Sequence, residues 1–280
     1  MKIDSFEAKN IHIFGGSSGI GLATAKQLAS LGANITIYAR TESTLKEAAA
    51  EIEDHRMDPH QYVSWVSVDV SVPEDVQQAI TANVDSFGMP DILINCAGRA
   101  YPEHFEAISY QQFEETMKVN LFGIWNSIQS ILPYMKEKGG LIVNTSSVVG
   151  YVGVFGYTDY AASKFGIIGL SEALRSELKR YGIGVSVLCP PDTETPGFEI
   201  ENQTKPAETK AISEGAGLLG PDEVASYLIK GMESGKKMII PGFDGKLAYY
   251  VKRWFPAVFE FIMDRTVLKA QQKIRQGDLA

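Results

Sequence analysis

The sequence predicts an α/β fold: one doubly wound domain around a seven-stranded parallel sheet, followed by a helical tail. Short β-branched and apolar runs recur along the 280 residues, and they alternate with stretches whose apolar residues repeat three and four apart. Alternating strands and crossover helices form a parallel sheet with helices on both faces. No Pro/Gly-rich linker, internal repeat or low-complexity tract divides the chain, so we expect a single domain over residues 1–245.

Seven runs are the candidate strands: residues 10–14, 34–38, 62–68, 92–95, 141–145, 185–188 and 238–240. Residues 11–14, 92–94 and 141–143 are almost continuously apolar, which is typical of central strands that are covered on both faces. A long helix is expected over residues 160–181, where Gly182 ends it.

Composition excludes several classes of function. Twenty-six Lys+Arg against 34 Asp+Glu give a net charge of -8, so no general basic field exists and no nucleic-acid partner is expected. The two cysteines form no CxxC pair, which suits a reducing compartment, and the four histidines lack metal-ligand spacing, so no metal site is predicted. The polar first ten residues lack the pattern of a secretory signal, and we expect a cytoplasmic protein.

A glycine-rich turn follows the first strand directly and leads into a helix-period segment. Backbone N–H groups at a helix N-terminus, together with the helix dipole, bind anions, and glycines let the backbone approach a pyrophosphate. The spacing is GxxxGxG rather than the commoner GxGxxG, so its position between strand and helix is the stronger signal. The turn predicts a Rossmann-type dinucleotide site at Gly15-Gly16-Ser17-Ser18-Gly19-Ile20-Gly21.

Arg40 indicates which dinucleotide is bound. NAD-binding sheets usually offer Asp or Glu to the adenosine ribose at the end of the second strand, and this chain has Arg40 there. A guanidinium can pair with a 2′-phosphate, which favours NADPH over NADH. The alternative is an ordinary solvent-facing arginine at a helix start.

One Tyr-x-x-x-Lys pair stands in a catalytic context. Two such pairs occur, Tyr134/Lys138 and Tyr160/Lys164, and the four-residue spacing places phenol and ammonium on one helix face. Only Tyr160 has a serine thirteen residues upstream, Ser147, just after the strand 141–145. Ligands bind at strand ends in open parallel sheets, so Ser147, Tyr160 and Lys164 are the candidate catalytic set.

Taken together, these motifs resemble the short-chain dehydrogenase/reductase family over about residues 8–240. The resemblance also includes Asp69 after the third strand, the run Asn95-Cys96-Ala97-Gly98, and Asn120. It implies that Asp69 holds the adenine ring and that Asn95 and the following turn support the central strand and the cofactor. It also implies that Lys164 binds the nicotinamide ribose and that Asn120 holds a water that passes protons to Lys164. The cofactor contacts it implies are Gly15, Ser17, Ser18, Gly19, Ile20, Gly21, Arg40, Asp69, Val70, Asn95, Ala97, Gly98, Tyr160 and Lys164.

Ketone reduction explains why these residue types are needed. Hydride delivery to carbon leaves negative charge on oxygen, so a proton donor and a hydrogen-bond donor must meet that oxygen. Tyr160 is expected to give the proton and Ser147 to orient the carbonyl. Lys164, an oxidised nicotinamide and a helix N-terminus are expected to favour the phenolate.

One departure from the family pattern narrows the expected substrate. The family usually has Pro-Gly after the sixth strand, whereas this chain has Pro190-Pro191 followed by Asp-Thr-Glu-Thr-Pro-Gly-Phe. This run and residues 201–206 resemble the 3-ketodihydrosphingosine reductases, which implies reduction of that long-chain 3-keto lipid to dihydrosphingosine. It also implies cofactor contacts from Pro190, Thr193 and Thr195. The weakly periodic residues 192–220 are expected to form an irregular lid over the acyl chain. A second departure is Phe14, where the family usually has Thr.

Two other functions stay open at this point. The first keeps the chemistry but changes the substrate to another 3-ketoacyl compound, a steroid or a small ketone. The second is a cofactor-binding sensor or scaffold without turnover. The intact set Asn120, Ser147, Tyr160 and Lys164 argues against a pure binder.

Residues 246–280 form a tail of different character, with seven basic and three acidic residues. Apolar residues lie there at helical spacing: Leu247, Tyr250, Val251, Trp254, Phe255, Val258, Phe259 and Ile262. Such an amphipathic helix can contact a membrane surface or pack on the domain or a partner subunit. Charges and a proline interrupt it, so it is not expected to span a bilayer. The family resemblance further implies a homodimer or homotetramer paired through the helices near Asn120 and Tyr160.

Overall fold

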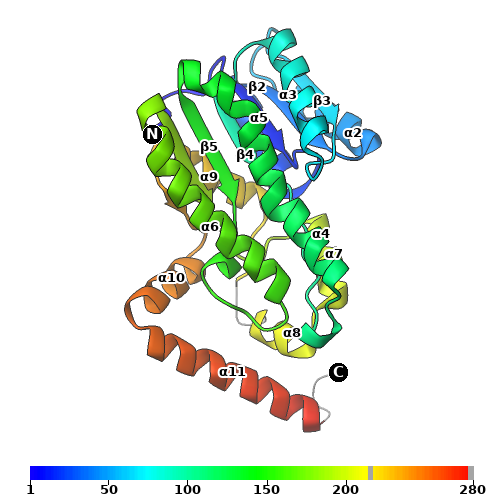
Figure 1. Cartoon of the computed structure of the whole chain (residues 1–280), viewed down its shortest axis with the longest axis vertical. Coiled ribbons are helices and arrows are strands. Elements are labelled where there is room, and N and C mark those ends of the chain that lie inside the picture. Colours follow the sequence, from blue (N-terminus) through cyan, green and yellow to red (C-terminus); the bar gives the residue numbers. More distant parts are fainter. Residues whose placement is uncertain (214–216, 277–280) are drawn as a thin grey trace.

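A computed structural model describes residues 1–213 and 217–276 of the chain. Its centre is a seven-stranded parallel sheet in the order β3-β2-β1-β4-β5-β6-β7 (Figure 1). The strands are β1 (Asn10–Phe14), β2 (Asn34–Ala39), β3 (Val63–Ser67), β4 (Ile92–Asn95), β5 (Gly140–Thr145), β6 (Ile183–Leu188) and β7 (Met238–Ile239). The predicted doubly wound fold is therefore confirmed, and the predicted strand ends are correct to within two residues.

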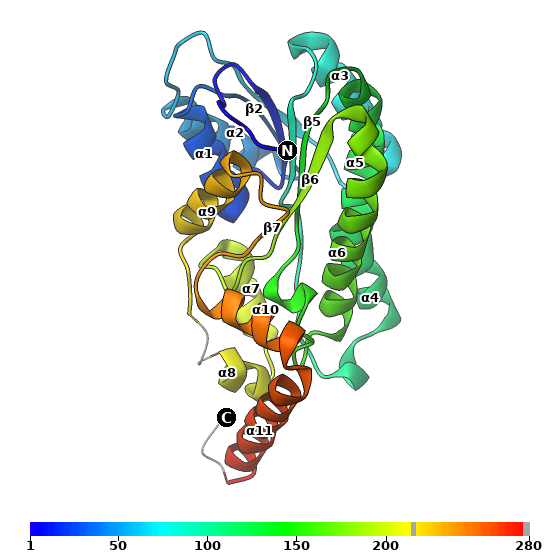
Figure 2. The ribbon, with the colours of Figure 1, turned by 90° about the vertical axis from the view of Figure 1, so that its left-hand side faces the viewer.

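Helices cover both faces of the sheet, as Figure 2 shows. The helices are α1 (Gly19–Ala29), α2 (Glu42–Glu53), α3 (Pro73–Phe87), α4 (Tyr110–Met117), α5 (Gly123–Lys138), α6 (Thr158–Leu178), α7 (Pro196–Thr204), α8 (Ala207–Ser213), α9 (Pro221–Glu233), α10 (Asp244–Trp254) and α11 (Pro256–Gln276). Apolar side chains of α1, α2 and α9 form the core on one face, and those of α3, α5 and α6 form it on the other.

The strand order reverses between β1 and β4, which lie side by side although β2 and β3 separate them in sequence. In open parallel sheets this reversal leaves a crevice outside the carboxyl ends of the strands. The glycine turn after β1 and the loop after β4 meet there. A Cβ on Gly15, whose φ is +77°, would lie 2.5 Å from the Ala97 backbone nitrogen, so only glycine allows this close approach.

The segment predicted as an irregular lid is partly helical. Helices α7 and α8 occupy much of residues 192–220, of which 214–216 lie outside the described residues. The Thr195 hydroxyl caps α7 by accepting from the Phe198 backbone N–H at 3.2 Å, and Pro196 stands at the first helical position. The expectation of an irregular lid was wrong because a local capping signal stabilises a helix with little apolar periodicity.

The tail forms two helices, α10 and α11, which are separated at Pro256. Helix α10 packs against the chain that follows β5. The Tyr151 hydroxyl donates to the Gly245 carbonyl at 2.9 Å, and the Tyr151 and Tyr249 rings meet edge to face. Helix α11 packs against α8 and extends away from the sheet (Figures 1 and 2). No helix among the described residues is long and apolar enough to cross a membrane. The last four residues of the predicted tail, 277–280, lie outside the described residues.

Candidate active site

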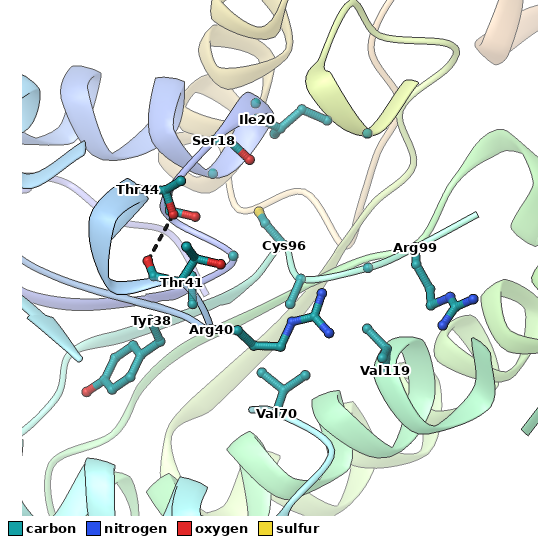
Figure 3. Close-up of a pocket in the computed structure, with 18 of the residues that line it drawn as sticks. Ser18, Ile20, Tyr38, Arg40, Thr41, Thr44, Val70, Cys96, Arg99 and Val119 are labelled. Carbon is teal, nitrogen blue, oxygen red and sulfur yellow. Dashed lines mark hydrogen bonds between the residues drawn. The ribbon is translucent and has the colours of Figure 1, made fainter. Parts of the chain in front are cut away.

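A cavity of about 430 Å³ opens at the carboxyl ends of β1, β2, β3 and β4 (Figure 3). Its volume falls in the range of pockets that hold small molecules and cofactors. Most of the predicted cofactor residues line it: Gly15, Ser17, Ser18, Gly19, Ile20, Gly21, Arg40, Asp69, Val70, Ala97, Gly98 and Thr195. The glycine turn and the residues expected near the adenosine thus share one cavity.

The N-terminus of α1 faces this cavity. Gly19 and Gly21 begin the helix, and both line the cavity. A Cβ on Gly21 would lie 2.1 Å from the Gly15 carbonyl oxygen, so a side chain here would force the turn open. Ser18, the N-cap residue, makes no side-chain cap bond, so it does not occupy the backbone donors of the first turn, and these can bind an anion in the cavity.

Arg40 and Asp69 lie near each other on the rim that β2 and β3 form. Partial burial opposes ionisation of Asp69, but hydrogen bonds from the backbone N–H and the hydroxyl of Ser71, at 2.9 and 2.7 Å, hold the pKa of that carboxyl below its usual range. The Arg40 guanidinium lowers it further. Arg40 is exposed and is one of the labelled side chains around the cavity in Figure 3, which suits contact with an anionic group of a ligand.

Five predicted cofactor residues do not line this cavity: Asn95, Tyr160, Lys164, Pro190 and Thr193. Asn95 is buried within the fold: its amide donates to Asn144 Oδ1 at 2.9 Å, and its carbonyl oxygen accepts from the Ser127 hydroxyl at 2.8 Å. Its side chain therefore ties β4 to β5 and α5. Pro190 and Thr193 lie in the chain after β6, where the Thr193 hydroxyl donates to the Pro191 carbonyl at 2.9 Å.

Ser147, Tyr160 and Lys164 come together from two neighbouring segments. Ser147 follows β5 and caps a short 3₁₀ turn by accepting from the Val149 N–H at 3.1 Å. Tyr160 and Lys164 lie one turn apart on α6, with the Lys164 Nζ 5.4 Å from the Tyr160 ring centroid. The Ser147 hydroxyl is close enough to the Tyr160 phenol to lower its pKa by hydrogen bonding.

Asn120 lies in a π-helical turn, Lys118–Phe122, between α4 and α5. It is fully buried, and its amide donates to the Arg99 carbonyl at 2.9 Å and to the Ser163 hydroxyl at 3.0 Å. A Cβ built on Gly98 would lie 3.4 Å from Asn120 Oδ1 and 3.5 Å from Lys164 Nζ. Asn120 and Lys164 therefore flank the same glycine.

Burial sets the protonation of the two central groups. It raises the pKa of the Tyr160 phenol well above its usual value, and the carboxylates of Glu201 and Asp192 raise it further. Burial lowers the pKa of the Lys164 ammonium to about 8, although Lys164 donates to the Thr145 carbonyl at 2.9 Å. The protein without cofactor thus keeps Tyr160 protonated, whereas we expected Lys164, the helix terminus and an oxidised nicotinamide to favour phenolate. A protonated phenol suits a proton donor.

Sequence reasoning missed several residues at the site. Thr41, Thr44, Cys96, Arg99, Tyr101, Val119 and Thr145 also line the cavity. A group of four side chains near Tyr160 was missed as well. Tyr157 and Lys205 are buried, and Asp192 and Glu201 are partly buried. The four-residue spacing of Glu201 and Lys205 is a local signal that could have found that pair. The described residues contain no group of three or more His, Cys, Asp or Glu side chains arranged to hold a metal ion.

Comparisons with known proteins agree with this geometry. The family model for short chain dehydrogenases matches residues 9–206. The chain is 41% identical over 238 residues to a 3-ketodihydrosphingosine reductase of Bos taurus, covering 84% of this chain and 72% of that protein. A 3-dehydrosphinganine reductase of Danio rerio gives the same identity and coverage. The crystal structure of levodione reductase superposes with a TM-score of 0.78 at 27% identity, covering 88% of this chain and all of that one. The chain belongs to the short-chain dehydrogenase family.

Proposed function

We propose that this chain is an NADPH-dependent reductase that converts 3-ketodihydrosphingosine to dihydrosphingosine, a step of sphingolipid biosynthesis. The proposal depends above all on the convergence of Ser147, Tyr160 and Lys164 in a chain 41% identical to a reductase named for that substrate. The Pro190-Pro191 run and the lid that follows support the same substrate.

The cavity suits NADPH. The backbone donors of the glycine turn and of the first turn of α1 would hold the diphosphate, Arg40 the 2′-phosphate and Asp69 the adenine end. When bound, NADPH supplies the hydride that reduces the ketone carbon. The exposed Arg40 guanidinium at the rim is the feature that favours NADPH over NADH.

The chain's own residues supply the proton and the polarisation. Tyr160, kept protonated by burial, donates its proton to the ketone oxygen as negative charge develops there, and the Ser147 hydroxyl donates a second hydrogen bond. The nearby Lys164 ammonium stabilises the phenolate that this step leaves. Asn120, which lies beside Gly98 as Lys164 does, would hold a water that returns a proton toward the lysine.

A substrate panel tests the proposal. NADPH oxidation is followed with long-chain 3-ketodihydrosphingosine, a short 3-ketoacyl thioester, a steroid ketone and a small cyclic ketone. We expect the highest kcat/KM for 3-ketodihydrosphingosine, with dihydrosphingosine as the product. Preference for one of the other ketones would move the chain to a different substrate class, and no turnover with any of them would favour a cofactor-binding sensor.

The catalytic unit proposed here comprises residues 1–245, with residues 192–220 as the lid over the acyl chain.

Helices α5 and α6 carry exposed aromatic side chains outside the cavity, Trp125 and Phe165, and Phe122 lies exposed just before α5. Burying this surface against a second copy would remove apolar area from water, which supports a homodimer or homotetramer. Light scattering coupled to size exclusion measures the state, and a Trp125→Glu variant that remains oligomeric would contradict this interface.

Helices α10 and α11 support peripheral contact with a membrane surface. Trp254, Phe255, Val258, Phe261 and Ile262 are all exposed and gather around the junction of the two helices. Basic residues flank them, a combination typical of interfacial helices. Sedimentation with anionic vesicles tests this contact. We expect Trp254→Ser to weaken binding severalfold, and equal binding of both proteins would contradict the proposal.

A further inference from the structure

Three charged side chains meet in the lid beside the catalytic tyrosine. Lys205 Nζ lies 3.0 Å from Glu201 Oε1 and 3.4 Å from Asp192 Oδ2. The Lys205 side chain is only 2% exposed and that of Glu201 15% exposed, whereas the Asp192 side chain is 30% exposed. Two carboxylates therefore share one buried ammonium, and this lid charge group of Asp192, Glu201 and Lys205 carries one negative charge in excess.

The Tyr157 side chain connects the lid charge group to the Tyr160 phenol. The Tyr157 hydroxyl donates to Glu201 Oε1, and the Tyr157 and Tyr160 ring centroids are 5.6 Å apart. After burial, Glu201 is the largest influence that raises the pKa of the Tyr160 phenol, and Asp192 acts in the same direction. The excess negative charge therefore acts on the phenol that is proposed to bind the ketone oxygen.

A buried negative charge of this kind is stabilised when another cation approaches. Burial raises the pKa of Glu201, and Asp192 raises it further, although Tyr157 and Lys205 oppose the shift. An ionised group held in a protein interior is costly unless it is paired and hydrogen-bonded. A cationic ligand next to the phenol would supply the missing pairing.

The proposed substrate has such a cation. This step rests on the proposed function: 3-ketodihydrosphingosine is an α-amino ketone, with its protonated amine on the carbon next to the ketone. When Tyr160 and Ser147 hold the ketone oxygen, that ammonium must lie beside them.

We propose that Glu201, supported by Asp192, accepts a hydrogen bond from the substrate ammonium and so selects long-chain α-amino ketones over ketones that lack the amine. A neutral 3-ketoacyl chain would leave the excess carboxylate without a cationic partner. The site would then select the amino ketone both by the ion pair that it forms and by the cost of leaving the carboxylate unpaired beside a neutral ketone. Lys205 and Tyr157 both contact Glu201 Oε1 and so orient its carboxylate.

The test compares two substrates that differ only in the amine, 3-ketodihydrosphingosine and 1-hydroxyoctadecan-3-one, in wild type and Glu201→Gln. The amide keeps an oxygen that can accept from Tyr157 but removes the charge. We expect the wild type to favour the amino ketone. In Glu201→Gln, KM for the amino ketone should rise about 10- to 100-fold, the range of a hydrogen bond to a charged group, while KM for the neutral ketone stays nearly constant. A change in Tyr160 protonation alone would alter kcat for both substrates together.

Glu208→Gln is the matched control, because Glu208 is another buried lid carboxylate whose ion-pair partner is His104, at 4.0 Å. This control should keep the wild-type preference for the amino ketone, with KM for each substrate nearly unchanged. NADPH affinity reports folding, and Asp192→Asn serves as a second variant, with a smaller shift in the same direction. If the wild type reduces both ketones with equal KM, or the variants weaken both substrates alike, the ammonium role is overturned while the reductase function stands. If the wild type reduces neither ketone, the proposed function itself fails.

Discussion

Removing the Tyr160 hydroxyl gives the sharpest separation between catalysis and cofactor binding. Tyr160→Phe deletes one oxygen whose neighbour in the site is the Ser147 hydroxyl, and it leaves the ring packed against Tyr157 at 5.6 Å. Tyr160 does not line the cavity that holds the glycine turn and Arg40. We therefore expect NADPH affinity and stability to change little, because the lost atom contributes neither core packing nor cofactor contacts.

Turnover should respond very differently. General acid catalysis contributes typically about 10²- to 10⁴-fold, so kcat of Tyr160→Phe should fall by at least about 100-fold. The measurements are single-turnover oxidation of bound NADPH with 3-ketodihydrosphingosine and, separately, NADPH binding by fluorescence titration. Tyr134→Phe is the matched control, because Tyr134 belongs to the other Tyr-x-x-x-Lys pair, and its hydroxyl contacts Thr81 at 3.1 Å, away from the cavity. Near-normal turnover in Tyr160→Phe would refute the assignment of the proton donor, and equal losses in both variants would show a general effect on the fold.

Three further predictions concern the cofactor turn and the core. Arg40→Asp should lower kcat/KM with NADPH about 10- to 100-fold and raise it with NADH, because a 2′-phosphate loses a charged hydrogen bond; an unchanged preference would remove Arg40 from that role. Gly21→Ala should abolish NADPH binding in a calorimetric titration, since its Cβ would lie 2.1 Å from the Gly15 carbonyl oxygen, and normal binding would contradict the tight turn. Burial lowers the pKa of His12 to about 4, below the unfolded value, so the unfolded state binds the extra proton and stability falls as the pH drops below about 6.5. In urea unfolding, the free energy of unfolding of the wild type should be about 2 kcal/mol lower at pH 5 than at pH 8, and His12→Gln should not show this decrease. The same decrease in both proteins would assign it to other groups.

The strands were predictable because each is short, apolar and bounded by turn residues. Ile92–Asn95 and Gly140–Thr145 are buried along their whole length, and their continuous apolar runs indicated this directly. The two-residue strand β7 pairs only at Met238 and Ile239, so its predicted third residue had no partner strand to extend along. Local pattern determined these elements, and pairing with neighbouring strands shifted their ends by one or two residues.

The parts of the candidate site whose residues lie close together in the sequence were predictable. The glycine turn, Arg40 and the Tyr160–Lys164 pair are each identified by a local spacing, and the structure brings the turn and Arg40 to one cavity. Asn95 was expected to support both the central strand and the cofactor, and its side-chain bonds to Asn144 and Ser127 serve the strand. Nothing in the sequence distinguishes a side chain that points into the sheet from one that points into the cavity.

The lid charge group could not be found from sequence alone. Asp192 comes from the chain after β6, Glu201 from the C-terminal half of α7, and Lys205 follows that helix directly. Only the folded lid brings these three side chains together near Tyr160. Lys205 would read as an ordinary surface lysine just after a helix, yet its side chain is almost fully buried. The folded lid, rather than any single motif, decides which charges face the reacting groups.

Isotope transfer tests the reductase activity most directly. The chain is incubated in ordinary water with NADPH deuterated at both hydrogens of the reactive nicotinamide carbon and with 3-ketodihydrosphingosine, and the product is analysed by mass spectrometry. We predict dihydrosphingosine that carries one deuterium at the former ketone carbon, formed in proportion to the NADPH consumed. Recovery of unlabelled product, or of unreacted ketone with intact NADPH, would contradict the account.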